Sequence, residues 1–298
     1  MGRTWLRGMA ISMKTLDNVR FVPMLAGLFL AGMLVVPAVS IAAQPPVNLG
    51  TTKNFAVLAG STVTNTGPTT IDGNAGGDVG LAPGSEFVST GVTMSGVQHI
   101  SDAVAIKAQT DLVAAYDDAA GRTPFTTLDA DLTGKTLKSG VYVSTTGELL
   151  ITGVLTLDAQ GDPNAVFIFK SASTLIMMPG SSVRLINGAR YCRVFWQVTS
   201  SATLDTGSHF VGHLFAMTSI SAKTGATIQG QLLARTGAVT LDTNTITNGL
   251  CATVSTGTVN GGKLPKTATP WYNLLLAGAV LAMLGAGGLW ATTRRIHA

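Results

Sequence analysis

The stretch KTGATIQGQLLARTGAVTLDTNTITNGLC, residues 223–251, consists almost entirely of Thr, Gly, Ala, Asn and aliphatic residues, with only three charged side chains. Acid–base catalysis needs a titratable group near the working pH, and this stretch offers almost none. Short runs of aliphatic and hydroxyl residues bounded by glycine are typical of β-strands. The stretch therefore predicts a neutral, hydroxyl-rich β-surface.

Internal repeats extend this pattern along the last third of the chain. The triplets Ala202-Thr203-Leu204, Ile220-Ser221-Ala222 and Val239-Thr240-Leu241 follow one another at 18 and then 19 residues. A coil of about 18 residues is the period of a β-solenoid, whose coils stack about 4.8 Å apart. The interior is then expected to be filled by aliphatic residues: Ile220, Ile228, Leu232, Val239, Leu241 and Ile246.

A second set of repeats follows the triplets and places threonine at matching positions. Its members are Thr206-Gly207-Ser208-His209-Phe210, Thr224-Gly225-Ala226-Thr227-Ile228 and Thr243-Asn244-Thr245-Ile246, with related phrases at Thr90-Gly91-Val92-Thr93-Met94 and Gly67-Pro68-Thr69-Thr70-Ile71. Because alternate residues of a strand face opposite sides, the hydroxyl side chains fall on the outside of the solenoid.

One segment departs from the β pattern. Apolar residues recur at helical spacing across residues 97–120, and Gly121 is suited to end a helix there. Ser95 or Ser101 is expected to cap its start. We therefore expect one long α-helix, packed along a side of the β-stack to bury its apolar stripe.

Several phrases in chain order carry a family resemblance. They are GDVGLAPGSEF, DAVAIKAQTDLVAAYDDAAGR, NAVFIFK, RVFWQVTSSATL and GATIQGQLLARTGAVTLDTNTIT. Across Val47 to Cys251 the chain resembles the ice-binding-protein-like family of secreted bacterial, algal and fungal proteins. The resemblance implies a mainly β fold over residues 47–252: a discontinuous, right-handed parallel β-solenoid of triangular section with the helix alongside. Two positions depart from the family: Thr199 stands where Gly is usual, and His209 interrupts the threonine column.

Elementary geometry also favours ice as the ligand. Outward hydroxyls repeat at about 4.8 Å between coils and about 7 Å along a strand, and a rigid lattice of this kind orders water at little entropic cost. We expect the ice-binding residues to be Thr90, Thr93, Thr206, Thr224, Thr227, Thr243 and Thr245. A rival ladder on an adjacent face contains Ser219, Ser221 and Thr240. Threonine ladders also serve stability alone, so sequence does not decide between the two faces.

A β-solenoid is compatible with two other functions. Many β-solenoids degrade polysaccharides, but such enzymes need carboxylates that converge on a cleft. The acids of this chain are scattered among turns and the helix end (Asp72, Asp78, Asp117, Asp118, Asp158, Asp162), so we expect no enzyme and no cofactor. The alternative function is that of a wall-anchored adhesin or structural surface protein without ice affinity, because proteins of one fold can bind different ligands.

The two cysteines, Cys192 and Cys251, are expected to form one disulfide in an oxidising compartment. No metal is expected, because zinc requires more ligands than the four histidines supply as a cluster. His209 and His213 are four residues apart, a spacing that does not place them on one face in a strand-and-turn context.

The two ends of the chain predict export and anchoring. Residues 1–43 resemble a secretory signal peptide, with basic residues, an apolar run and a small-residue cleavage site. After a linker at 253–263, residues 264–298 resemble an LPxT-type sorting signal: LPKTA, an apolar span at 271–290 and a basic tail. A sortase would cut after Thr267 and join it to peptidoglycan. An unprocessed span would instead retain the protein in the membrane, so we expect a cell-wall or membrane-anchored extracellular protein.

The charge of the exported part follows from these ends. Six of the 19 lysines and arginines and one of the 15 acids lie outside residues 44–267, which leaves 13 basic and 14 acidic side chains between them. The formal net charge of +4 therefore belongs to the targeting segments. No nucleic-acid partner is expected from a near-neutral domain.

Overall fold

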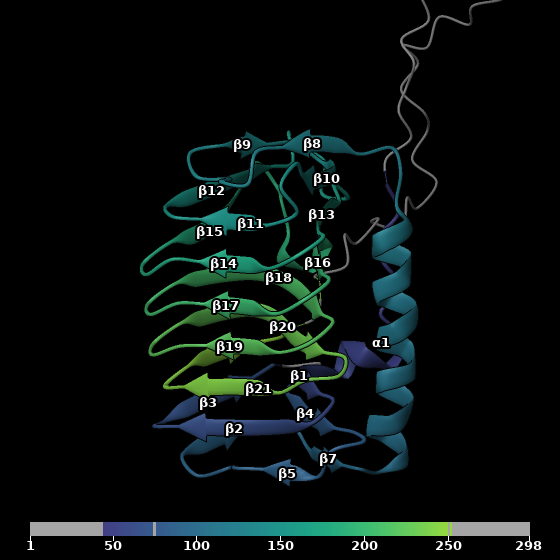
Figure 1. Cartoon of the computed structure of the whole chain (residues 1–298), viewed down its shortest axis with the longest axis vertical. Coiled ribbons are helices and arrows are strands. Elements are labelled where there is room, and N and C mark those ends of the chain that lie inside the picture. Colours follow the sequence, from purple (N-terminus) through teal and green to yellow (C-terminus); the bar gives the residue numbers. More distant parts are fainter. Residues whose placement is uncertain (1–43, 74–75, 250, 252–298) are drawn as a thin grey trace, which may run out of the picture. The chain divides into compact units, whose positions relative to one another are not determined.

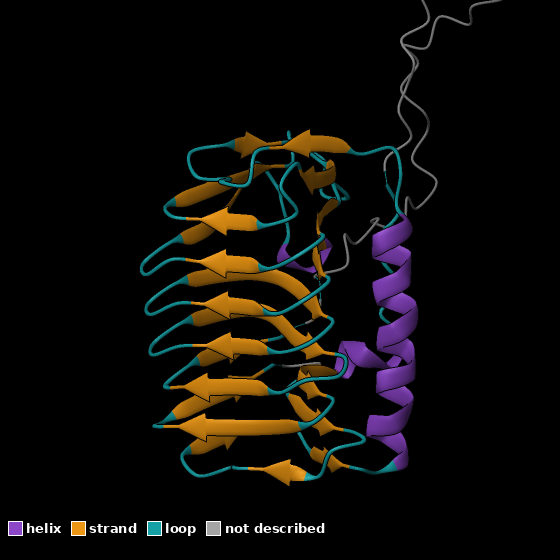
Figure 2. Cartoon of the chain, viewed as in Figure 1, coloured by secondary structure: helices purple, strands orange, loops and turns teal. Residues whose placement is uncertain are grey.

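The computed structural model describes residues 44–73, 76–249 and 251. It is a parallel β-solenoid with one long helix alongside, and successive coils stack into three faces (Figures 1 and 2). The expected fold, mainly β and built from parallel strands with a helix packed beside them, is confirmed. The signal segment 1–43, the linker 253–263, the LPKTA motif with Thr267 and the apolar span 271–290 lie outside the described residues.

Each face is a stack of parallel strands, in the following order from one end of the solenoid to the other. The first face contains β7 (Gln98–Ile100), β4 (Asp78–Leu81), β1 (Phe55–Ala59), the second halves of β20 (Thr227–Ala234) and β18 (His209–Ala216), β16 (Val194–Val198), β13 (Phe167–Ser171), β10 (Gly140–Ser144) and β8 (Thr126–Leu128). The second face is the separate seven-stranded sheet, with β5 (Glu86–Phe87), β2 (Thr62–Thr66), β21 (Val239–Asp242), β19 (Ile220–Ala222), β17 (Ala202–Leu204), β14 (Leu175–Met177) and β11 (Leu149–Ile151). The third face contains β6 (Val92–Met94), β3 (Thr69–Asp72), β22 (Thr245–Thr247), the first halves of β20 and β18, β15 (Ser182–Ile186), β12 (Val154–Asp158) and β9 (Thr136–Leu137).

Strands β18 and β20 turn the corner between the third and first faces. Thr227 of β20 pairs with β22, whereas Leu232 pairs with β1, so the two halves of β20 have different neighbours. The corner lies at Gly212 and Gly230, whose φ angles of 119° and 143° are accessible to glycine and strained for other residues. These glycines let a single strand serve two faces.

The solenoid is discontinuous in chain order. Strands β1, β2 and β3 pair with β20, β21 and β22, so the beginning of the domain stacks directly on its end. The chain then passes through the helix to the opposite end of the stack and winds back (Figure 1). The helix is therefore the crossover that makes this order possible.

The helix α1 spans Ala103–Gly121, so the predicted start at residue 97 was wrong. Residues Gln98–Ile100 instead form β7 and pair with β4, and Ile100 packs against the interior core from this strand. The N-cap is Asp102 rather than Ser95 or Ser101, and its carboxylate accepts from the Ala105 amide at 2.8 Å. Within the described residues, no helix is both long and apolar enough to span a bilayer.

The core has two parts, one inside the coils and one beneath the helix. The six aliphatic residues predicted to fill the interior are all buried there, which confirms the repeat assignment. Beneath α1, Ala108, Leu112 and Ala115 pack on Phe195 and Phe215 of the first face. The short 3₁₀ helix η1 (Gly50–Asn54) contacts α1, whereas η2 (Tyr191–Arg193) contacts β18 and β20.

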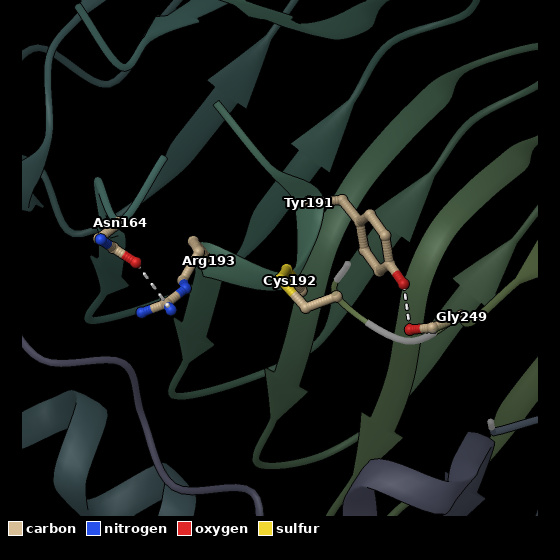
Figure 3. Close-up of a disulfide and its surroundings, with 6 residues drawn as sticks. Asn164, Tyr191, Cys192, Arg193 and Gly249 are labelled. Carbon is tan, nitrogen blue, oxygen red and sulfur yellow. Dashed lines mark hydrogen bonds between the residues drawn. A yellow bond between two sulfur atoms is a disulfide. The ribbon is translucent and has the colours of Figure 1, made fainter. Parts of the chain in front are cut away.

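The predicted disulfide is present between Cys192 of η2 and Cys251, with 5.5 Å between the Cα atoms. The hydroxyl of Tyr191 donates to the Gly249 carbonyl beside it, and Arg193 donates to the Asn164 side chain at 3.3 Å (Figure 3). The end of the domain is therefore tied to the middle of the stack by a covalent and a polar contact.

Candidate functional site

The three faces differ in what they offer to a ligand. The first face is covered by α1, which packs on β16, β4, β1 and β13. The second and third faces are free of such a cover in the described part of the chain, and both carry threonine. The two faces are compared below by the register of their outward residues and by the charges that they carry.

The favoured threonine set is divided by the structure. Thr93, Thr227 and Thr245 lie in one column of the third face, in register with Thr70 and interrupted by His209 as predicted. The remaining members lie in the turns that link the second face to the third: Thr90, Thr206, Thr224 and Thr243. The seven residues thus occupy a strand column and a neighbouring corner rather than one strand plane.

The corner hydroxyls are already engaged by Asp242. Thr224 donates to this carboxylate, and the Thr243 hydroxyl donates to it at 3.0 Å. Thr243 has a positive φ of 52°, which marks it as a turn residue. These contacts stabilise the turns, so Thr224 and Thr243 have a structural role irrespective of any ligand.

The third face is neither flat nor uncharged. Arg184, His209 and Asp72 occupy exposed outward positions on it. Next to the His209 column is a hollow of about 300 Å³, lined by His209, Thr227, Gln229, Thr245, Thr247 and three neighbours. His209 is the exposed residue that follows Thr227 in this column, and its Nδ1 lies 2.7 Å from the Thr227 hydroxyl.

The second face is built on an unbroken parallel register. Ile176, Thr203 and Ser221 follow one another directly, and Thr240 and Thr64 continue the column. In the three-residue strands β14, β17 and β19 the flanking residues are buried and the central one faces outward. The outward column is therefore Leu150, Ile176, Thr203, Ser221, Thr240 and Thr64.

A second row of small residues, polar except for Ala238, runs beside this column, two residues earlier in each coil. Its members are Thr174, Ser201, Ser219, Ala238 and Thr62. Ser219 Oγ accepts from the Ala238 amide at 3.2 Å, and Ser201 Oγ accepts from the Ser219 amide at 3.3 Å. Within the outward column itself, the Thr64 and Thr240 hydroxyls lie 3.3 Å apart. These bonds hold the hydroxyls in fixed positions along the stack.

Charges on the second face are confined to its margins. Lys223 pairs with Asp205 at 3.1 Å on the edge next to the corner turns. The Thr206 amide and Lys223 hold the pKa of Asp205 below its usual value. Glu148 and Glu86 lie toward the two ends of the stack. The middle of the face is therefore neutral.

Sequence reasoning found part of this face. Ser219, Ser221 and Thr240 were recognised as a ladder adjacent to the favoured one. Thr64, Thr203, Thr62 and Ser201 were missed. Thr203 was recoverable as the centre of the first aligned triplet, but Thr64 reaches the ladder from a segment 176 residues away from Thr240. No local repeat carries that information.

No metal centre is assembled in the part of the chain that the structure describes, where no three His, Cys, Asp or Glu side chains are grouped for a metal ion. His209 is exposed, whereas His213 is only 3% exposed and lies on the far side of the Gly212 corner. The two histidines therefore lie in different environments, because β18 turns at Gly212 between them.

These features define a parallel β-solenoid with one flanking helix and a hydroxyl-bearing sheet that the helix leaves open. The family model described as Ice-binding-like matches residues 57–247, and the chain belongs to this family. The ice-binding protein of Nostoc sp. (strain HG1) is 46% identical over 205 residues, which cover 67% of this chain and 73% of that relative.

Solved structures show the same fold. An ice-binding protein from an Antarctic biological consortium has a TM-score of 0.66 at 44% identity, covering 69% of this chain and 92% of that chain. The ice-binding protein of the Antarctic ascomycete Antarctomyces psychrotrophicus has a TM-score of 0.64 at 39% identity, covering 68% and 98%. The family and these relatives are ice-binding proteins rather than enzymes.

Proposed function

We propose that this protein binds ice through the second face, with the hydroxyl rows of β17, β19, β21 and β2 as the contact surface. The observation that carries the proposal is the unbroken register of Thr203, Ser221 and Thr240, continued by Thr64. The strands that carry these hydroxyls are about 4.8 Å apart, so the sheet fixes the spacing of the column before any ligand binds. Water ordered on such a surface loses little further freedom when it joins a crystal.

The neutrality of the central rows supports the same assignment. Formal charges hold their hydration water strongly and in radial order, which disagrees with the arrangement of an ice plane. The charges of the second face lie at its margins, and Lys223 and Asp205 neutralise each other there. The relatives named as ice-binding proteins agree with this function at the level of the family.

Paired substitutions test the choice of face. Ser221→Tyr raises a ring from the middle of the second face, so we expect most of the thermal hysteresis and inhibition of ice recrystallisation to be lost. Thr227→Tyr places the same ring on the third face and is expected to leave activity unchanged. Both side chains point outward, so the free energy of unfolding should change by no more than about 0.5 kcal/mol.

The outcomes of this pair are distinct. Loss of activity in Thr227→Tyr with Ser221→Tyr unaffected moves the site to the column of Thr93, Thr227 and Thr245. If neither substitution matters and the unmodified protein does not adhere to ice, the wall-anchored adhesive or structural role becomes the better account. Crystal shaping by the purified protein is the first measurement, because it decides whether a contact face needs to be sought.

We further propose that the protein is exported and attached to the cell surface through its sorting signal. The support is the order of signal-like segment, domain, LPKTA, apolar span and basic tail in the sequence. Thr267→Ala is expected to abolish covalent attachment while export continues. Muramidase digests of wall fractions would then lose the protein, which would remain with the membrane; unchanged release from the wall would refute sortase attachment.

A further inference from the structure

An apolar cleft of about 570 Å³ lies between α1 and the corner loops that join the first face to the second. On the helix side it is lined by Ile106, Thr110 and Val113, which recur at helical spacing on one face of α1. The opposite wall is formed by Ala82 and Pro83, in the link from β4 to β5, and by Arg235 and Thr236, in the link from β20 to β21.

The cleft runs parallel to the helix axis. Ile106 and Val113 are two turns apart, a separation of about 10 Å at 1.5 Å per residue. The two corner links are separated by the coil of β1 and β2, which places them about two coil spacings apart, also about 10 Å. The result is an elongated groove with matching walls rather than a round pit.

Its walls expose aliphatic side chains that the core does not use. Ile106 is 55% exposed and Val113 is 37% exposed, although both lie on a helix whose other face is fully buried. Pro83 is exposed opposite them. A single exposed aliphatic residue is ordinary, but three that face one another across a groove form a contiguous apolar surface.

Arg235 brings a positive charge and one unpaired N–H donor, at Nε, to this apolar groove. Its side chain is only 17% exposed, and its Nε is buried with no hydrogen-bond acceptor among the described residues. The nearest carboxylate is Asp117, with 3.8 Å between Nη1 and Oδ1, beyond hydrogen-bond distance, and the Asp117 side chain is 66% exposed. The guanidinium lies 4.8 Å from the Tyr116 ring centre, which fixes its position.

The neighbouring polar side chains direct their own donors to backbone carbonyls, and none of the described groups accepts from Arg235 Nε. Thr236 donates to the Met217 carbonyl at 2.7 Å, Thr110 donates to the Ile106 carbonyl at 3.1 Å, and Gln109 donates to the Ala234 carbonyl at 3.2 Å. An Nε–H group that is buried without an acceptor is costly, and a carboxylate is the group whose geometry fits the paired N–H donors of a guanidinium.

We propose that this cleft binds a single-chain amphiphile with a carboxylate head, such as a fatty acid. The carboxylate accepts hydrogen bonds from Arg235, and the alkyl chain lies along Ile106, Val113 and Pro83. Cavities of several hundred Å³ with apolar walls and one fixed polar group are typical of small-molecule sites. The site is separate from the proposed ice-contact rows, so either proposal can fail without the other.

Calorimetric titration of the purified protein with dodecanoate, below its micelle concentration, tests the proposal. We expect one saturable site. Arg235→Gln should weaken dodecanoate binding by tenfold or more, whereas Arg184→Gln, which removes an exposed arginine of the third face, should leave it unchanged. Dodecyltrimethylammonium, with the same chain and the opposite charge, should not bind at this site.

A second pair of variants covers the case in which Arg235→Gln disturbs the contact with Tyr116. Ile106→Asp places a negative charge in the cleft and should abolish binding, while Ala114→Asp, on an exposed helix position outside the cleft, should not. The proposal is overturned by an absence of saturable binding, by equal binding of the two amphiphiles, or by variants of the cleft that match their controls. Ice shaping is expected to be the same in all four variants.

Discussion

His213 should make the protein lose stability as the pH falls from about 6.5 to about 4. Its imidazole is buried between Phe195, at a ring distance of 5.2 Å, and Tyr191, at 6.4 Å. Burial lowers its pKa from 6.5 to about 4. The Gln231 side chain and the Cys192 backbone offset part of this shift, although neither ring nitrogen makes a hydrogen bond of normal geometry in the described chain. We therefore attribute the shift to the loss of hydration of the charged ring.

The sign and size of the effect follow from the two pKa values. Between pH 6.5 and 4 the unfolded chain takes up a proton at His213 that the folded protein does not, so acid favours unfolding. The contribution is complete above pH 6.5, and about 3 kcal/mol is lost by pH 4, since each pKa unit corresponds to about 1.4 kcal/mol. Asp111, with a pKa lowered from 3.8 to about 2 by Lys107 and Thr51, acts only at lower pH.

Urea unfolding of the oxidised protein at pH 7, 6, 5 and 4.5 measures how the free energy of unfolding falls with pH. His213→Phe keeps a ring against Phe195 and removes the titrating group, so its stability should decline less with acid than that of the unmodified protein. The difference should approach about 1.4 kcal/mol per pH unit near pH 5. His209→Gln, at an exposed position, is the control for histidine removal. Equal pH dependence in His213→Phe and the unmodified protein would refute the assignment.

Two further predictions concern the fixed points of the fold. Cys192→Ser should lower the free energy of unfolding by about 4 kcal/mol, because the disulfide closes a loop with a sequence separation of 59; finding both cysteines reactive in unreduced, denatured protein would disprove the bridge. Asp102→Ala should cost about 1 kcal/mol of unfolding free energy through loss of the cap on the Ala105 amide, measured by urea unfolding, and Asp102→Asn should recover most of it. A larger loss in Asn than in Ala would exclude capping as the cause.

The sequence by itself determined the period of the coils, the residues that fill them and the pairing of the two cysteines. The coil period and the interior residues follow from repeats between neighbouring segments, and the cysteine pairing follows because the chain has only two cysteines. Residues such as Ile220 and Val239 recur at one coil length, and parallel stacking of contiguous coils then places them in register inside. The neutral composition of residues 223–251 likewise indicates an outward hydroxyl surface without reference to any long-range contact.

Tertiary structure alone decided which hydroxyls share a plane. Thr64 joins Thr240 because the first coils stack on the last, a pairing of distant segments that no local repeat encodes. Thr224 and Thr227 belong to the same repeated phrase, so the sequence does not distinguish them. In the structure Thr224 lies in a turn, where its hydroxyl donates to Asp242. The start of α1 and the placement of Arg235 beside Ile106 and Val113 also depend on long-range packing. Periodicity gives the spacing between coils, but the corners and the neighbours of a solenoid are set by contacts between chain segments far apart in sequence.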